Sequence, residues 1–186
     1  MRKIIASLFV SLDGVIEAPE TWHFPYFNDE MGQIVGAQMA RRDTMLLGRR
    51  TYEEFAKYWP DQTGDIADEM NGTPKLVAST TLDTVEWANS SLIEGDVVAE
   101  LARVKRGPGR DISIVGSATL VRSLLGAGVL DELHLLVHPI VVGQGQRLFV
   151  DGSDSIPLRL AVSTALSTGV LSLTYTQVGR KRPRKR

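Results

Sequence analysis

The chain has 186 residues, a length that fits one compact domain rather than two. Apolar residues make up 43% and charged residues 23%, which excludes wholesale disorder. There are no cysteines, so disulfide frameworks, thiolate zinc sites and cysteine nucleophiles are excluded as well.

The net charge of −1 conceals a basic C-terminus. Residues 180–186 hold six of the 21 basic side chains, which leaves 15 basic and 22 acidic side chains in the rest of the chain. A body with a net charge of −7 is a poor general binder of nucleic acid. We expect a domain over residues 1–178 and a disordered basic tail over residues 179–186.

The N-terminal segment imitates a secretory signal without completing it. Basic residues precede an apolar run over residues 4–12, but Asp13-Gly14 interrupts the run and no small-residue cleavage site follows. No stretch reaches the roughly 18 apolar residues that span a bilayer. We therefore expect a cytoplasmic protein without a membrane partner, whose first strand is buried.

Short apolar runs alternate with amphipathic segments up to residue 142. The runs at residues 4–12, 44–47, 75–79, 112–115 and 132–142 are typical of buried strands. Helices are expected to begin after Asn28, Gly48, Asp96 and Gly116, where apolar residues recur at helical spacing. The polar residues 60–74 are expected to form a surface connection.

The last two apolar segments, residues 160–166 and 170–178, flank a Ser-Thr-Gly turn and predict an antiparallel hairpin. Strands that alternate with helices predict right-handed crossovers and a mainly parallel sheet. The sequence therefore predicts a single α/β domain, in which helices flank a mixed, mostly parallel sheet with the C-terminal hairpin at one edge.

Four predicted strand ends are rich in glycine and hydroxyl residues: residues 11–14, 48–51, 79–81 and 116–120. In an open α/β sheet, ligands bind at the carboxyl ends of the strands. Gly48 and Gly116 each precede a helix whose free N–H groups favour a phosphate, and Arg49 and Arg50 beside the first helix favour a dianion. Two such sites in one small sheet predict a dinucleotide, although the Rossmann and P-loop glycine patterns are absent.

Five segments, in this order and spacing, resemble the dihydrofolate-reductase-like superfamily, and within it the RibD C-terminal domain of bacterial riboflavin biosynthesis proteins. They are SLDG at residues 11–14, LGRRTYE at 47–53, KLVAST at 75–80, IVGSATLVRSLL at 114–125 and DELHLLVHPIVVGQGQRLF at 131–149. The resemblance covers roughly residues 3–178. It implies a homodimer that uses NADPH to reduce a C=O or C=N bond of a small polar, heterocyclic substrate, as in the reduction of 5-amino-6-(5-phosphoribosylamino)uracil.

The resemblance also implies where the cofactor binds. The adenosine 2′-phosphate would lie against Gly48, Arg49 and Thr51. The adenine ribose would lie against Ser79 and Thr80, and the nicotinamide against Leu12 and Gly14. The diphosphate would be cradled by Gly116, Ser117, Ala118, Thr119 and Leu120. Close relatives often carry arginine at the position of Thr80, so a preference for NADPH over NADH rests here on Arg49 and Arg50.

Two acidic residues and an aromatic loop are the candidates for the chemistry itself. Asp13 can orient a substrate hydroxyl or relay a proton, or it can be part of an ordinary Asp-Gly turn. Asp29 can take part in catalysis or only stabilise the start of a helix. Trp22, Phe24 and Phe27 can form the wall of a site for a planar heterocycle, or fill the space beneath a loop.

Two alternatives to this reductase stay open at this point. Dihydrofolate reductases carry an acidic residue two positions after a W-x-x-P motif, and here that position is Phe27. Phe27 at that position argues against folate reduction, which is kept as one alternative, and a nucleotide-binding regulator without turnover is the other. A metal site is not expected, because His134 and His138 share a strand face without a third ligand in sight.

Overall fold

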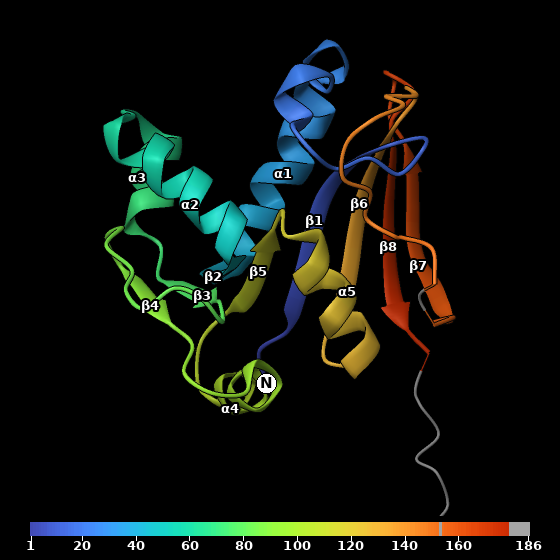
Figure 1. Cartoon of the computed structure of the whole chain (residues 1–186). Coiled ribbons are helices and arrows are strands. Elements are labelled where there is room, and N and C mark those ends of the chain that lie inside the picture. Colours follow the sequence, from blue (N-terminus) through green and yellow to red (C-terminus); the bar gives the residue numbers. More distant parts are fainter. Residues whose placement is uncertain (153, 179–186) are drawn as a thin grey trace, which may run out of the picture.

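The structure, a computed structural model, describes residues 1–152 and 154–178 (Figure 1). Within these residues one sheet has the strand order β4-β3-β2-β5-β1-β6-β8-β7. Six strands run parallel: β1 (Ile4–Ser11), β2 (Arg42–Gly48), β3 (Lys75–Ala78), β4 (Ser90–Leu92), β5 (Asp111–Val115) and β6 (Glu132–His138). The hairpin of β7 (Leu158–Ala165) and β8 (Leu171–Gln177) continues the sheet antiparallel to β6. The predicted fold class is confirmed. The basic tail over residues 179–186 lies outside the described residues.

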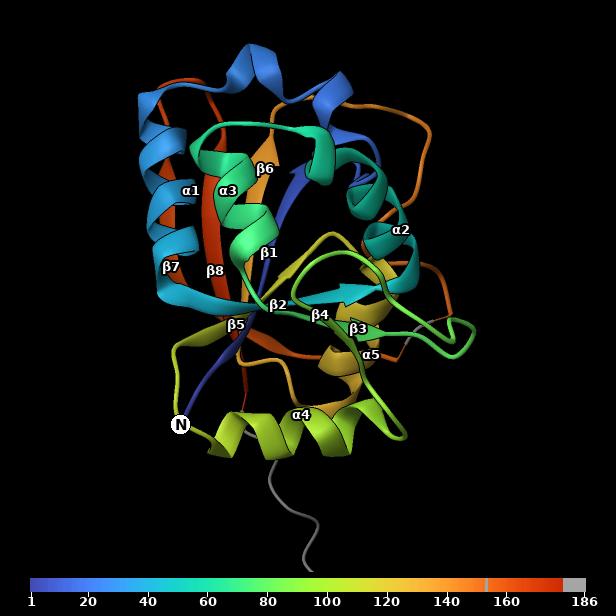
Figure 2. The ribbon, with the colours of Figure 1, turned by 90° about the vertical axis from the view of Figure 1, so that its left-hand side faces the viewer.

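Helices cover both faces of the parallel part of the sheet. On one face lie α1 (Asp29–Arg41), α2 (Arg49–Tyr58) and α3 (Asp65–Gly72), all of which are seen above β2 in Figure 2. On the other face lie α4 (Val97–Arg106) and α5 (Ala118–Ala127). Three short 3-10 turns, Pro19–Thr21, Phe24–Tyr26 and Trp59–Asp61, complete the connections.

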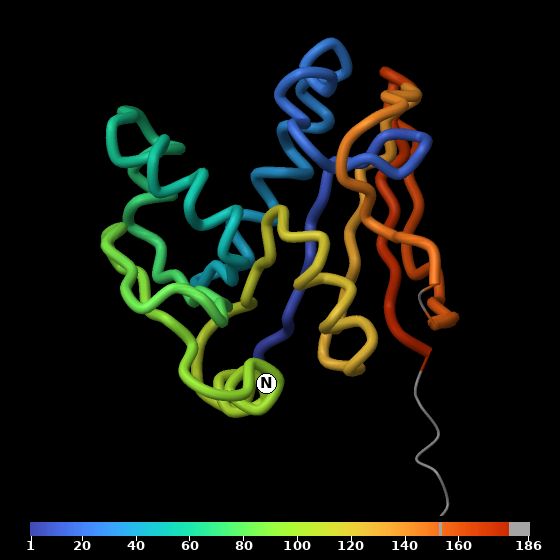
Figure 3. Tube along the Cα trace, viewed as in Figure 1, coloured from blue at the N-terminus to red at the C-terminus, as the bar shows by residue number. Residues whose placement is uncertain are grey.

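The central strand β1 carries the core because both of its faces are covered. Ile4, Ala6, Leu8 and Val10 pack with β5, β6 and the apolar faces of α4 and α5. The tube in Figure 3 shows the N-terminus beside α4, where the Arg2 N–H donates a 3.1 Å hydrogen bond to the Lys105 carbonyl. No helix among the described residues is long and apolar enough to cross a bilayer.

The predicted caps form as expected. The Asn28 side chain accepts a 3.0 Å hydrogen bond from the Met31 N–H, and Asp96 accepts one of 2.7 Å from the Ala99 N–H. Each cap satisfies an N–H group that has no partner within its own helix, which fixes where the helix begins.

Two expectations about elements were wrong. Residues 60–74 are not only a surface connection, because α3 lies there and buries Ala67 and Met70; two apolar contacts in eight residues are too few to stand out in the sequence. The expected strand over residues 132–142 ends at His138, because Pro139 has no N–H to donate to a neighbouring strand. The three-residue β4 was not anticipated at all.

Candidate functional site

A cavity of about 1040 Å³ lies on the sheet face that carries α1, α2 and α3. Figure 2 shows α1 and α2 on either side of β1 over this face. The cavity walls come from these helices, the loop over residues 16–23 and the start of α5. Its floor consists of Ser7 and Phe9 from β1, Ser113 and Val115 from β5, and His134 and Leu136 from β6.

Two of the predicted anion-binding turns meet at the edge of this cavity. The Ser117 hydroxyl accepts a 2.9 Å hydrogen bond from the Gly48 N–H and lies 2.8 Å from the Thr51 hydroxyl. Gly116 has a φ of +69°, and a Cβ added there would lie 3.1 Å from the Thr51 hydroxyl oxygen. The turn after β5 is thus fixed against the start of α2, and glycine is needed both for the backbone conformation and for the close approach.

The starts of α2 and α5 both leave backbone N–H groups free for a ligand. Neither Gly48 nor Ser117 caps its helix with a side chain. The helix dipole and these N–H groups favour a negatively charged group. Arg49 and Arg50 are exposed beside the start of α2, and among the described residues Arg49 pairs only with Glu53, at 3.0 Å. These features fit the phosphates of a dinucleotide.

The structure brings together most of the predicted binding residues but not all of them. Those that line the cavity are Phe27, Gly48, Arg49, Thr51, Gly116, Ser117, Ala118, Thr119 and Leu120. Those outside its lining are Leu12, Gly14, Trp22, Phe24, Ser79 and Thr80. The Ser79 hydroxyl accepts hydrogen bonds from the N–H groups of Thr81 and Leu82, so it is used within its own turn. Trp22 is buried, and its indole N–H donates to the Glu17 carbonyl at 3.1 Å.

The Asp13 carboxylate holds a loop in place. It accepts hydrogen bonds from the Ser11 hydroxyl at 2.6 Å, the Val142 N–H at 3.0 Å and the Gly143 N–H at 2.9 Å. These donors, the Ser11 hydroxyl first, hold the pKa of Asp13 well below its ordinary value. A carboxylate so strongly ionised is poorly suited to deliver a proton, and its contacts are those of a turn residue.

The second acidic candidate, Asp29, is exposed at the first residue of α1 and lies outside the cavity lining. In that position its charge complements the helix dipole. A catalytic role for Asp13 or Asp29 stays a prediction.

The prediction missed several polar residues that line the cavity, among them Ser7, Gln38, Ser113 and His23. The Ser7 and Ser113 hydroxyls make no hydrogen bond to any residue that the structure describes. The sequence did offer one sign of Ser7 and Ser113, because each is a polar residue within an otherwise apolar strand. Such a residue faces either a covering helix or a binding site. His23 lies within the Trp22–Pro25 motif, between aromatic residues whose pattern gives no sign of a free imidazole.

The other two histidines are held by the protein. The His134 Nε2 lies 2.8 Å from a Glu132 carboxylate oxygen, and its Nδ1 lies 3.3 Å from the Gln38 amide nitrogen. The His138 Nδ1 lies 2.8 Å from the Leu136 carbonyl oxygen. Among the described residues, no group of three potential ligands could hold a metal ion.

Comparisons with known proteins agree with this architecture. The uncharacterized protein YyaP of Bacillus subtilis (strain 168) is 30% identical over 186 residues, with 94% of each chain covered. A protein of Shewanella sp. PV-4, provisionally assigned to riboflavin biosynthesis, has a TM-score of 0.73 at 21% identity, over 96% of this chain and 100% of the other. Dihydrofolate reductase of Enterococcus faecalis, solved with NADP(H), has a TM-score of 0.62 at 17% identity, over 94% and 96% of the two chains.

A third solved structure belongs to a two-activity enzyme. The diaminohydroxyphosphoribosylaminopyrimidine deaminase/5-amino-6-(5-phosphoribosylamino)uracil reductase of Thermotoga maritima has a TM-score of 0.66 at 13% identity, over 95% of this chain and 57% of that one. At such identities these structures establish the fold alone. The model of the RibD C-terminal domain family matches residues 2–172, and the chain therefore belongs to that family.

Proposed function

We propose that this protein is an NADPH-dependent reductase of a small polar, heterocyclic compound. The observation that carries the proposal is the pair of turns joined through the Ser117 hydroxyl, each at the start of a helix without a side-chain cap and both open to one large cavity. Family membership and the NADP(H)-bound dihydrofolate reductase of the same fold support it.

NADPH would supply a hydride when bound. We assign its 2′-phosphate side to Gly48, Arg49 and Thr51, because the exposed Arg49 can exchange its Glu53 partner for a phosphate. We assign its diphosphate to the turn at residues 116–120, where Gly116 lets the ligand approach the backbone. The Ser117 hydroxyl keeps these two contact points at a fixed separation, so little ordering remains to be done on binding.

The substrate would occupy the inner part of the cavity, over the sheet. The free hydroxyls of Ser7 and Ser113 and the side-chain amide of Gln38 offer hydrogen bonds to a ring with carbonyl and amino groups. The Phe27 ring, which also lines the cavity, supplies an apolar wall. This mixture fits a uracil-like heterocycle, and the substrate named for the Thermotoga maritima reductase is of that class.

The test is NADPH oxidation with 5-amino-6-(5-phosphoribosylamino)uracil, 7,8-dihydrofolate and an aromatic aldehyde as substrates. We expect turnover with the pyrimidine, weak or no turnover with dihydrofolate, and loss of turnover at subsaturating NADPH in the Arg49→Ala, Thr51→Ala double variant. NADPH binding without oxidation in the presence of any of the three would favour a nucleotide-binding regulator. Absence of NADPH binding would overturn the proposal.

We also propose that the protein is a homodimer, with the β7–β8 hairpin at the interface. Seven of the eight residues of β7 are exposed, and Leu160, Val162 and Leu171 leave between 42% and 57% of their surface open to solvent. A second copy is the simplest cover for such an apolar edge. Sedimentation equilibrium should give a dimer for the wild type and a monomer for Val162→Lys. A monomeric wild type would overturn this proposal without affecting the reductase proposal.

A further inference from the structure

Resting on the proposed reductase function, we propose that His23 is the proton donor of the reaction. His23 follows Trp22 in the loop between β1 and α1, lines the cavity and is only 6% exposed. Its Nδ1 is buried without a hydrogen-bond partner, and neither ring nitrogen bonds to any residue that the structure describes. A buried polar group normally finds a partner, so an imidazole left free beside a cavity indicates a group meant for a ligand.

The His23 ring is held rigidly even though its nitrogens are free. It stacks on Phe9, with 4.6 Å between the ring centroids and 12° between the planes, and Phe24 covers it with its ring centroid 4.2 Å away. The Phe27 ring meets it edge-on at 6.0 Å. Aromatic contacts therefore fix the imidazole. They cover Nδ1, which leaves Nε2 as the nitrogen that can give a proton to a ligand in the cavity.

The sheet register places His23 beside the proposed cofactor turn. Ser7 of β1 pairs with Val115, the last residue of β5, and both line the cavity. Phe9 points to the same face as Ser7 and lies about 7 Å farther along the strand, since each residue adds about 3.3 Å. At that level β5 has ended and the chain has entered the turn at Gly116. His23, stacked on Phe9, is thus at the end of the cavity that this turn borders.

In the reaction, the carbon of the substrate's C=N or C=O bond accepts a hydride from NADPH, and the π electrons of that bond move to the nitrogen or oxygen. The His23 imidazolium releases its proton to that atom. The substrate is reduced by two electrons and gains one hydride and one proton, while NADPH becomes NADP⁺. The neutral imidazole is then protonated again by water in the open cavity.

The groups around His23 favour release of its proton. Burial and the His138 imidazole, whose centroid is 6.1 Å away, lower the pKa of His23, while the Glu20 carboxylate raises it in part. The rings from β1 and from the Phe24–Tyr26 turn that pack against it are uncharged. An imidazolium in this setting loses its proton readily once a basic atom is formed next to it.

The first test needs no turnover, because the chain has only three histidines. In a nuclear magnetic resonance titration, His23→Phe removes one of three Cε1–H signals and so identifies it. We expect that signal to titrate below the ordinary value of 6.5 and to move when NADP⁺ or 5-amino-6-(5-phosphoribosylamino)uracil is added. A His23 signal that does not titrate between pH 4 and 8, and that neither compound moves, would overturn the assignment.

The second test separates chemistry from packing. His23→Phe keeps an aromatic ring between Phe9 and Phe24 but has no proton to give. We expect its kcat with the pyrimidine to fall about 100-fold or more, with NADPH affinity and thermal stability close to wild type. We also expect the wild-type rate to fall as the pH rises past the pKa of His23, and this dependence to vanish in the variant.

Retention of wild-type kcat by His23→Phe would overturn the role of His23 and leave the reductase proposal intact. A wild type that binds NADPH but reduces none of the three compounds would overturn both proposals together.

Discussion

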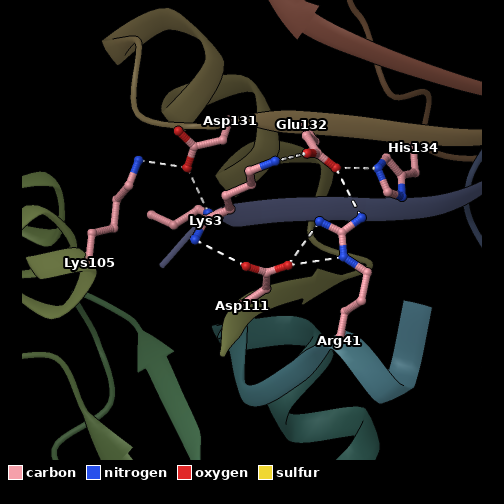
Figure 4. A network of polar contacts seen from close by, with 8 residues as sticks. Lys3, Arg41, Lys105, Asp111, Asp131, Glu132 and His134 are labelled. Atoms are coloured by element: carbon pink, nitrogen blue, oxygen red, sulfur yellow. Dashed lines mark hydrogen bonds and ion pairs between the residues drawn. The ribbon is translucent and has the colours of Figure 1, made fainter. Parts of the chain in front are cut away.

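The two ends of the parallel strands are built from similar polar residues that are used in opposite ways. At the amino ends, charged side chains bind one another. Lys3 donates to Glu132 at 2.6 Å, Arg41 bridges Glu132 and Asp111, and Lys105 pairs with Asp131 at 2.6 Å. Figure 4 shows these residues as one continuous network across β1, β5 and β6.

At the carboxyl ends, polar groups are held in place but not used up. The starts of α2 and α5 have no side-chain caps, and the cavity that they border is also lined by the His23 ring and by the Ser7 and Ser113 hydroxyls from the middle of β1 and β5. Unpaired polar groups weaken a fold unless a ligand pairs with them. Under the proposed function, the amino ends stabilise the domain, whereas the carboxyl ends bind the ligand. Substitutions at the amino ends should therefore lower the stability of the fold, and substitutions at the carboxyl ends should weaken ligand binding.

The largest expected effect on folding is at Lys75, at the amino end of β3. Its buried ammonium donates to the carbonyls of Asn71, Thr73 and Ala88 and lies 4.1 Å from the centroid of a Trp87 ring. Burial and the nearby Arg42 lower the pKa of Lys75 to about 8, which still leaves it charged at neutral pH.

Lys75→Met should lower the free energy of unfolding by about 4 kcal/mol, because three carbonyls lose their donor. Urea unfolding measures this loss. The exposed Lys57→Met is the matched control and should change stability by less than about 0.5 kcal/mol. Equal stability of the two variants would contradict the claim that polar groups at the amino ends of the strands stabilise the fold.

The next largest expected effect is the dependence of folding stability on pH that Glu132 causes. Burial alone would raise its pKa, but hydrogen bonds from Lys3 and His134 and the charge of Arg41 lower it to about 2. A carboxyl with a depressed pKa contributes stability above its unfolded value of 4.5, and this contribution is lost as the pH falls from 4.5 toward 2.

The contribution of Glu132 amounts to about 3 kcal/mol at neutral pH. Urea unfolding measures the free energy of unfolding at pH 7 and at pH 3. The difference between the two values should be smaller in Glu132→Gln than in the wild type, whereas the exposed Glu94→Gln should behave as wild type. An unchanged pH dependence in Glu132→Gln would show that the network does not stabilise the fold in this way.

The smallest expected effect on stability is at Ser117, where we expect a larger effect on the affinity for NADPH. Ser117→Ala removes the hydroxyl that joins Gly48 to Thr51. It should lower the free energy of unfolding by about 1 kcal/mol and weaken NADPH binding about tenfold. Calorimetric titration measures the affinity, with Ser91→Ala, at an exposed position of β4, as control. The reverse pattern, with stability lost and affinity kept, would place Ser117 among the structural residues.

The local signals in the sequence predicted the elements that they control directly. Asn28 and Asp96 cap their own helices, so the starts of α1 and α4 follow from the residue type. Gly48 and Gly116 marked the turns at the cavity because a side chain does not fit at either position. Gly116 has a left-handed φ, and a Cβ on Gly48 would lie 3.0 Å from the Ser117 hydroxyl oxygen. The start of α3 has no side-chain cap, and tertiary contacts of Ala67 and Met70 hold that helix, which a single segment of sequence cannot show.

The cavity residues followed the same rule. Ser7 and Ser113 line one cavity because the register places β1 beside β5, and His23, which stacks on Phe9, lines the same cavity. Asp13 looked like a catalytic residue by its position at a strand end, and its contacts to a loop more than 120 residues away became visible only in three dimensions.

The most direct test of the central claim is a ¹⁵N chemical-shift map of the amide groups during titration with NADPH. We predict saturable shifts centred on Gly48, Arg49, Gly116, Ser117 and Ala118, with the amides of the Figure 4 network unmoved. Shifts centred elsewhere, or none at millimolar NADPH, would contradict the claim that the two joined turns hold the cofactor.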